Sequence, residues 1–182
     1  MVFRVAVLRH SQLPNEISQI EDCEFVVFKQ SGARLDFLDY PPLSSYFESR
    51  FDLVVMFLGG NDVIEYIHNP LTLAQRIKNR LFQIRNNANH VAFVNLESRD
   101  YEVRSRPRYR ITNEQYAEVS RVVNRSLKKF CAKNKMRFIT TRNIRFQGLV
   151  RQDGIHFNAQ AIQLLVQKIH NLALKTRDGL PE

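Results

Sequence analysis

The sequence is poor in the residues that mark several special classes of protein. It has two cysteines, no tryptophan, six glycines and six prolines among 182 residues. These counts exclude a disulfide scaffold, a collagen-like chain and a proline-rich disordered chain. Cys23 and Cys131 do not have the close spacing of zinc ligands. We therefore expect two reduced core thiols and no zinc site built on cysteine.

Long apolar runs are also missing. No stretch of about 18 apolar residues is present, so we expect no membrane-spanning helix. The first ten residues hold a short apolar stretch interrupted by Arg4 and Arg9, unlike a secretory signal. These features predict an intracellular protein, cytoplasmic or nuclear. With 44% hydrophobic and 25% charged residues, the chain reads as a single domain over residues 1–176 with a tail over 177–182.

Negative charge is scarce in one part of the chain. The net charge is +9, and residues 99–151 carry fifteen basic and four acidic side chains. The remainder is slightly acidic, so the positive charge is concentrated in less than a third of the sequence. Such a segment indicates an anionic partner, with a solvated polar surface as the alternative.

Apolar runs and helical patterns alternate along the chain. Strands are predicted over 2–8, 24–28, 52–58, 90–96 and 136–140. Helices are predicted over 71–87, 113–134 and 159–175, with short helices after Ser11 and over 42–49. Strands this apolar are typical of a parallel sheet covered on both faces. The alternation predicts an α/β fold with right-handed crossovers.

In such a sheet, functional sites form at the carboxyl ends of the strands. Ser11 follows the first strand, Asn61 follows the third, and Asp153 and His156 precede the last helix. Serine needs a base to take its proton, and a carboxylate to orient that base. The chemistry also needs donors for an oxyanion, which Gly32 and Asn61 could supply. These residues thus predict acyl chemistry.

These motifs resemble the SGNH, or GDSL-type, hydrolase family. The resemblance rests on Arg9-His10-Ser11, Gly32, Gly59-Gly60-Asn61-Asp62 and Asp153-x-x-His156, and it covers nearly the whole chain. It implies a three-layer α/β/α sandwich, flavodoxin-like, with a five-stranded parallel sheet in the order 2-1-3-4-5. It further implies ester hydrolysis or acyl transfer without metal or cofactor.

The resemblance assigns a role to each of these residues. Ser11 is the nucleophile, His156 the base, and Asp153 the group that orients it. The Ser11 and Gly32 N–H groups and the Asn61 side chain form the oxyanion hole. The alternatives are structural: Ser11 and Asp153 as helix caps, and Gly32 and Asn61 as turn formers.

The first motif departs from the family pattern. Arg9 and His10 stand where the family usually has glycine and aspartate, and the glycine permits a tight turn. A Gly-His-Ser variant is found in SGNH domains of animal LINE-type retrotransposon proteins, which this chain also resembles. The OSK domain of Oskar, which binds RNA without a triad, is a more distant likeness. His10 is expected either to touch the site or to face solvent, and Asp62 to bond backbone within its own loop.

A cluster of arginines follows the fourth and fifth strands, interleaved with Tyr101 and Tyr109. The cluster contains Arg99, Arg104, Arg106, Arg108, Arg110, Arg142 and Arg145. Such side chains suit an anionic substrate, an acidic membrane surface, or the phosphates and bases of RNA or single-stranded DNA. The two hypotheses are therefore an esterase with a basic rim, and a nucleic-acid-binding module with vestigial catalysis. The sequence does not fix the oligomeric state.

Overall fold

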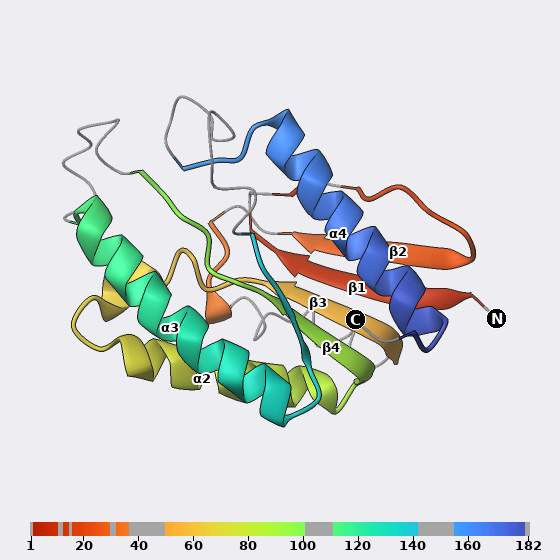
Figure 1. Cartoon of the computed structure of the whole chain (residues 1–182), viewed down its shortest axis with the longest axis horizontal. Coiled ribbons are helices and arrows are strands. Elements are labelled where there is room, and N and C mark those ends of the chain that lie inside the picture. The colour runs from red at the N-terminus through yellow and green to blue at the C-terminus, as the bar shows by residue number, and fades with distance from the viewer. Residues whose placement is uncertain are drawn as a thin grey trace.

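The computed structural model describes residues 2–10, 13–14, 16–29, 32–36, 50–100, 111–141 and 155–180. Within these ranges the chain forms a three-layer α/β/α sandwich (Figure 1). Its strands and helices, in chain order, are β1 (Phe3–Arg9), β2 (Cys23–Lys29), β3 (Phe51–Phe57), η2 (Val63–Tyr66), α2 (Pro70–Arg85), β4 (Ala88–Val94), α3 (Asn113–Lys133), β5 (Arg137–Ile139) and α4 (Ala159–Arg177).

The five strands form one sheet in the order β2-β1-β3-β4-β5, and every neighbouring pair is parallel. This confirms the predicted fold class and strand order. Each predicted strand and long helix is present, with ends displaced by one or two residues. The short helix expected after Ser11 is absent from the described residues 13–14 and 16–19. The one expected over 42–49 lies outside the described residues.

Alternate side chains of each central strand enter different halves of the core. Ala6 and Leu8 of β1 pack in the half that contains α2 and α3. Val5 and Val7 pack in the other half, against α4. Both faces of the sheet are therefore covered, which explains why the strands read as continuous apolar runs instead of alternating with polar residues.

Local signals set the ends of the helices. Pro70 occupies the first turn of α2, where a missing N–H costs nothing. Thr112 and Gln115 form a capping box at the start of α3. The Asn158 side chain accepts a hydrogen bond from the Ala161 N–H, at 2.9 Å, and so caps α4. The capping role weighed for Asp153 thus belongs to Asn158.

Both cysteines are free and buried, as predicted. Cys23 lies in the α4 half of the core and Cys131 in the α2–α3 half. Burial raises the pKa of the Cys131 thiol to about 11, so it stays protonated and behaves as an apolar side chain. Among the helices described, none has the length and apolar character needed to cross a bilayer.

Candidate active site

The carboxyl ends of β2, β1 and β3 are in register. Arg9, the last residue of β1, lies beside Lys29 of β2 and Phe57 of β3. The segments that follow these strands therefore leave the sheet at one edge. Gly32, Asn61 and His156 are described there, whereas Ser11 and Asp153 lie outside the described residues. The six arginines 104, 106, 108, 110, 142 and 145 also lie outside them.

The first residue of the first motif is still part of a strand. Arg9 belongs to β1, is buried, and does not have a positive φ. Its guanidinium donates to the carbonyl of His10 at 2.8 Å. The conformation that a glycine would allow is therefore not used at this position, and the departure from the family pattern does not strain the backbone.

His10 is a core residue, which corrects the alternative of a solvent-facing side chain. It is 1% exposed, and its ring centroid lies 4.7 Å from that of Phe57. Burial lowers the pKa of His10 to about 4, so the imidazole is neutral at physiological pH. Its Nε2 lies 3.7 Å from Oε1 of Glu97. Neither ring nitrogen has a hydrogen-bond partner among the described residues.

Glu97 and Arg99 form a buried ion pair just past the end of β4. Nη2 of Arg99 lies 2.6 Å from Oε1 of Glu97, and the two side chains are 4% and 1% exposed. Nε of Arg99 donates to the same oxygen at 2.9 Å. Burial alone would raise the pKa of Glu97, but the neighbouring Arg99 and His10 hold it below its ordinary value. The carboxylate is therefore ionised and compensated.

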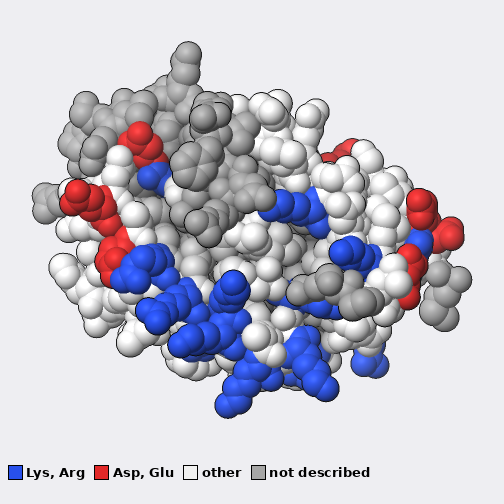
Figure 2. Space-filling model, viewed as in Figure 1, with Lys and Arg blue, Asp and Glu red and all other residues white. Residues whose placement is uncertain are grey.

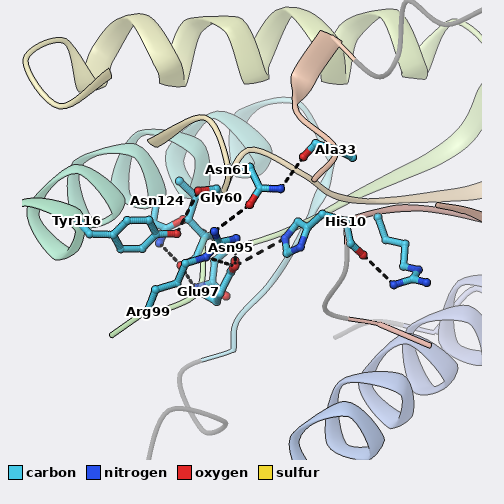
Figure 3. Close-up of polar contacts among 11 residues, drawn as sticks. His10, Ala33, Gly60, Asn61, Asn95, Glu97, Arg99, Tyr116 and Asn124 are labelled. Atoms are coloured by element: carbon cyan, nitrogen blue, oxygen red, sulfur yellow. Dashed lines mark hydrogen bonds and ion pairs between the residues drawn. The ribbon is translucent and has the colours of Figure 1, made fainter. Parts of the chain in front are cut away.

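Arg99 extends this pair to Asn61 (Figure 3). Its Nη1 donates to Oδ1 of Asn61 at 2.9 Å. Nδ2 of Asn61 donates in turn to the carbonyl of Ala33, also at 2.9 Å. Both ends of the amide are thus fixed, and the second hydrogen on Nδ2 is not used by any described group.

Because Gly60 has no side chain, the Glu97–Arg99 ion pair can lie directly against the backbone. A Cβ there would lie 2.6 Å from Nη2 of Arg99 and 3.0 Å from Oε1 of Glu97. The hydroxyl of Tyr116, from α3, also donates to the Gly60 carbonyl at 3.4 Å. Gly60 of the motif therefore serves packing around a buried charge, next to Asn61, whereas Gly59 has a φ of +105° and lies against Ile77 and Leu96.

Gly32 lies in the segment that Asn61 holds through Ala33. Its φ is +70°, and a Cβ at this position would meet no atom within 4 Å. The requirement for glycine is thus conformational and not steric. The structure brings this segment to Asn61, as the two oxyanion assignments require, without itself testing them.

Asp62 is structural but bonds a different segment from the one expected. Its carboxylate accepts from the N–H of Leu35, at 3.3 and 3.2 Å for its two oxygens, and so joins the segment after β3 to that after β2. The prediction of a bond within its own loop is wrong in this respect. Burial raises the pKa of Asp62 to about 6.

His156 precedes α4, and ring contacts of its neighbour link this segment to the end of β1. The next residue, Phe157, stacks on Phe57 with ring centroids 6.5 Å apart. Phe57 thereby contacts His10 on β1 and the segment that carries His156. The structure therefore brings His156, His10, Asn61 and the Gly32 segment to one edge of the sheet.

Sequence reasoning missed the ion pair at this edge. Arg99 was assigned to the arginine cluster that binds anions, but it is 8% exposed and bound to Glu97. Glu97 was given no role. The available signal was a carboxylate two residues before an arginine, directly after a buried strand. Within the described ranges, no group of three or more metal-binding side chains is present.

This is a parallel α/β sandwich whose glycine, asparagine and histidine segments lie at the carboxyl edge, where such sheets form their sites. The sequence matches the profile of the GDSL-like lipase/acylhydrolase family over residues 10–169. The chain belongs to this family. No curated protein matches the sequence.

Solved structures of similar fold include a GDSL-like lipase, an aryl esterase and TesA. A GDSL-like lipase from Bacteroides thetaiotaomicron is 15% identical, with a TM-score of 0.71, covering 95% of this chain and 88% of that chain. The native aryl esterase of M. smegmatis is 18% identical, with a TM-score of 0.68, covering 93% and 99%. TesA is 20% identical, with a TM-score of 0.64, covering 94% and 98%. At these identities the likeness establishes the fold alone. The narrower resemblance to retrotransposon and Oskar domains stays a prediction.

The buried pair predicts a strongly non-additive mutant cycle. Glu97→Ala or Arg99→Ala leaves one buried charge without its partner, and each should lower the free energy of unfolding by about 3–5 kcal/mol. The double variant should lose clearly less than the sum. Urea denaturation of the four proteins measures the coupling. Additive losses would contradict a compensated pair, and Glu118→Ala/Arg121→Ala provides an exposed control pair.

Asp62 predicts a particular pH dependence of stability. Its folded pKa, about 6, exceeds the ordinary value of 3.8. The contribution of Asp62 to the free energy of unfolding is therefore complete below about pH 4, and it is lost as the pH rises through about 6. Asp62→Asn keeps the acceptor for Leu35 but removes the charge. Its stability relative to wild type should rise by up to about 3 kcal/mol between about pH 4 and about pH 7. Thermal denaturation across pH measures this, with exposed Glu16→Gln as the control; a constant difference would contradict it.

Proposed function

We propose that the protein hydrolyses a carboxylic ester, with Ser11 as nucleophile, His156 as base and Asp153 as the group that orients His156. Membership of a family of lipases and acylhydrolases supports the reaction class. The observation that carries the proposal is a chain of ring contacts: Phe157, next to His156, stacks on Phe57, which contacts His10, the residue before Ser11. A base beside the candidate nucleophile is the first geometric requirement of this chemistry.

The reaction proceeds in two steps, acylation of Ser11 and hydrolysis of the acyl-enzyme. Ser11 Oγ attacks the ester carbonyl while His156 accepts the hydroxyl proton, and the resulting tetrahedral oxyanion collapses when His156 returns the proton to the leaving alcohol. Water then attacks the acyl-enzyme with His156 again as base, releasing the acid and regenerating Ser11. The oxyanion accepts hydrogen bonds from the Ser11 and Gly32 N–H groups and from Nδ2 of Asn61.

Arg99 takes part in this proposal as a positioning residue. An amide can donate to an oxyanion only if its nitrogen, and not its oxygen, faces the substrate. The bond from Arg99 to Oδ1 and the bond from Nδ2 to Ala33 together fix that orientation. A preoriented donor requires no reorganisation when the charge develops. The basic segments around residues 104–110 and 142–145 would then favour a substrate of negative charge.

The nucleophile assignment predicts a large loss of turnover in Ser11→Ala. Triad members act as a unit, so kcat for a short-chain p-nitrophenyl ester should fall by a factor on the order of 10⁴ or more. His156→Ala should fall similarly. His68, which is exposed and has no assigned role, provides the control His68→Ala. Activity retained in Ser11→Ala would remove the assignment.

The positioning role predicts a split between kinetic constants in Arg99→Lys. Lysine keeps the charge opposite Glu97 but lacks the planar fork that serves both Glu97 and Asn61. We expect kcat to fall by roughly 10–100-fold with KM nearly unchanged, because one oxyanion donor supplies about 10²–10³-fold. In an Asn61→Ala background the same substitution should have little further effect. Full, additive loss in that background would show that Arg99 acts on stability and not through Asn61.

A further inference from the structure

A second concave site lies at the opposite end of the sheet. It is a groove of about 700 Å³ at the amino ends of β4 and β5, beside the carboxyl ends of α2 and α3. Its ionisable lining consists of Arg85, His90, Lys128, Lys135 and Arg137. None of its lining residues is acidic. The volume is in the range of sites that hold small ligands or single units of a polymer.

The positive charge continues along the two helices beside the groove. Helix α2 carries four basic residues and no acidic one, and the acidic residues of α3 are confined to its first six positions. Figure 2 shows Lys and Arg side chains gathered at the bottom of the molecule, over α3. We define the basic groove by its five ionisable residues, with the cations of α2 and α3 as its margin.

Some cations elsewhere in the described residues have carboxylate partners. Arg4 pairs with Glu24, and Arg34 pairs with Glu65. Lys128 and Lys135 are exposed and make no ion pair within the described ranges. Their charges repel one another, so this arrangement costs stability unless an anion compensates it.

The helix dipoles explain only part of this cluster. Arg85 lies in the last turn of α2, where a cation stabilises the helix end. Lys128, however, lies more than one turn before the end of α3, and Arg137 lies beyond it on β5. Arg85 also donates to the backbone carbonyl of Asn134 at 3.2 Å, which fixes one wall of the groove to the other.

We propose that the basic groove binds the phosphates of a single-stranded nucleic acid. Several cations spread over a groove and two helices suit a chain of phosphates better than one isolated anion. The volume of about 700 Å³ is in the range of sites that hold single units of a polymer, and the lining includes Phe138 and Asn89. Proteins usually bind single-stranded nucleic acids with aromatic side chains and basic side chains together.

An acidic membrane is the less suitable partner for this site. Membrane surfaces are flat and are bound by exposed apolar side chains together with cations. Among the large apolar side chains described as exposed, only Phe82 lies in the half of α2 that ends at the groove. A concave site with a single exposed apolar side chain nearby fits a single-stranded nucleic acid better than a bilayer.

The test is a titration of a labelled oligouridylate with the full-length chain, followed by fluorescence anisotropy at about 50 and about 200 mM salt. Wild type should bind with an affinity that falls steeply with salt. Lys128→Glu/Lys135→Glu should weaken binding by roughly tenfold or more at low salt. It should also reduce the salt slope by about 1.4, since each phosphate contact on a single strand contributes about 0.7.

The matched control is Lys168→Glu/Lys175→Glu, which removes the same charge from α4 on the other face of the sheet. Both double variants change the net charge by the same amount. The control should nevertheless bind within about twofold of wild type, because its substitutions lie outside the groove. Circular dichroism verifies the fold of both variants. Ester hydrolysis should be unchanged in both, because neither touches the candidate active site, so this result is independent of the proposed function.

Four outcomes would overturn the proposal. They are no binding at low salt, equal losses in the two double variants, equal affinity for a duplex of the same length, and stronger binding to phosphatidylserine vesicles than to the oligouridylate. Equal losses would reveal diffuse attraction to net charge, and vesicle preference would assign the groove to a membrane.

Discussion

The carboxylate of Glu97 holds the candidate active edge together. It lies 2.6 Å from Arg99, which fixes Asn61, and 3.7 Å from His10, which follows β1. One buried charge thus connects the segments after three strands. Such a charge is costly to bury and is tolerated only when its partner is held in place. The side-chain-free Gly60 provides the space in which that partner fits.

This constraint also explains the unusual first motif. A neutral histidine can be buried beside a compensated carboxylate at moderate cost, whereas a second carboxylate at that position would face Glu97 with the same charge. His10 in place of the family's aspartate therefore suits a chain that carries Glu97 at the neighbouring strand end. Its contact with Phe57, which in turn stacks on Phe157, connects the histidine to the segment that bears His156.

The fold was predictable because each of its signals is local. The run of apolar residues in β3 and the Pro70 and Thr112 helix starts required no knowledge of distant contacts. The partners of polar side chains were not predictable in the same way. Asp62 bonds Leu35 and Arg99 bonds Asn61, across 27 and 38 residues of sequence. An arginine near other arginines in the sequence is predicted to be exposed, and only the fold reveals that Arg99 is buried. Ser11 and Asp153 were assigned by resemblance, and their roles stay a prediction.

The two ends of the sheet differ in how positive charge is compensated. At the carboxyl edge, Arg99 is matched by Glu97, and burial keeps His10 neutral. The Glu97–Arg99 pair is thus balanced, and the Asn61 side chain that it holds is oriented before any charge appears in the proposed reaction. At the amino edge, Lys128 and Lys135 have no described counter-ion and face solvent. Charge left unbalanced in this way attracts an anion that is already formed. One sheet thus separates a site suited to a transition state from a site suited to a stable polyanion.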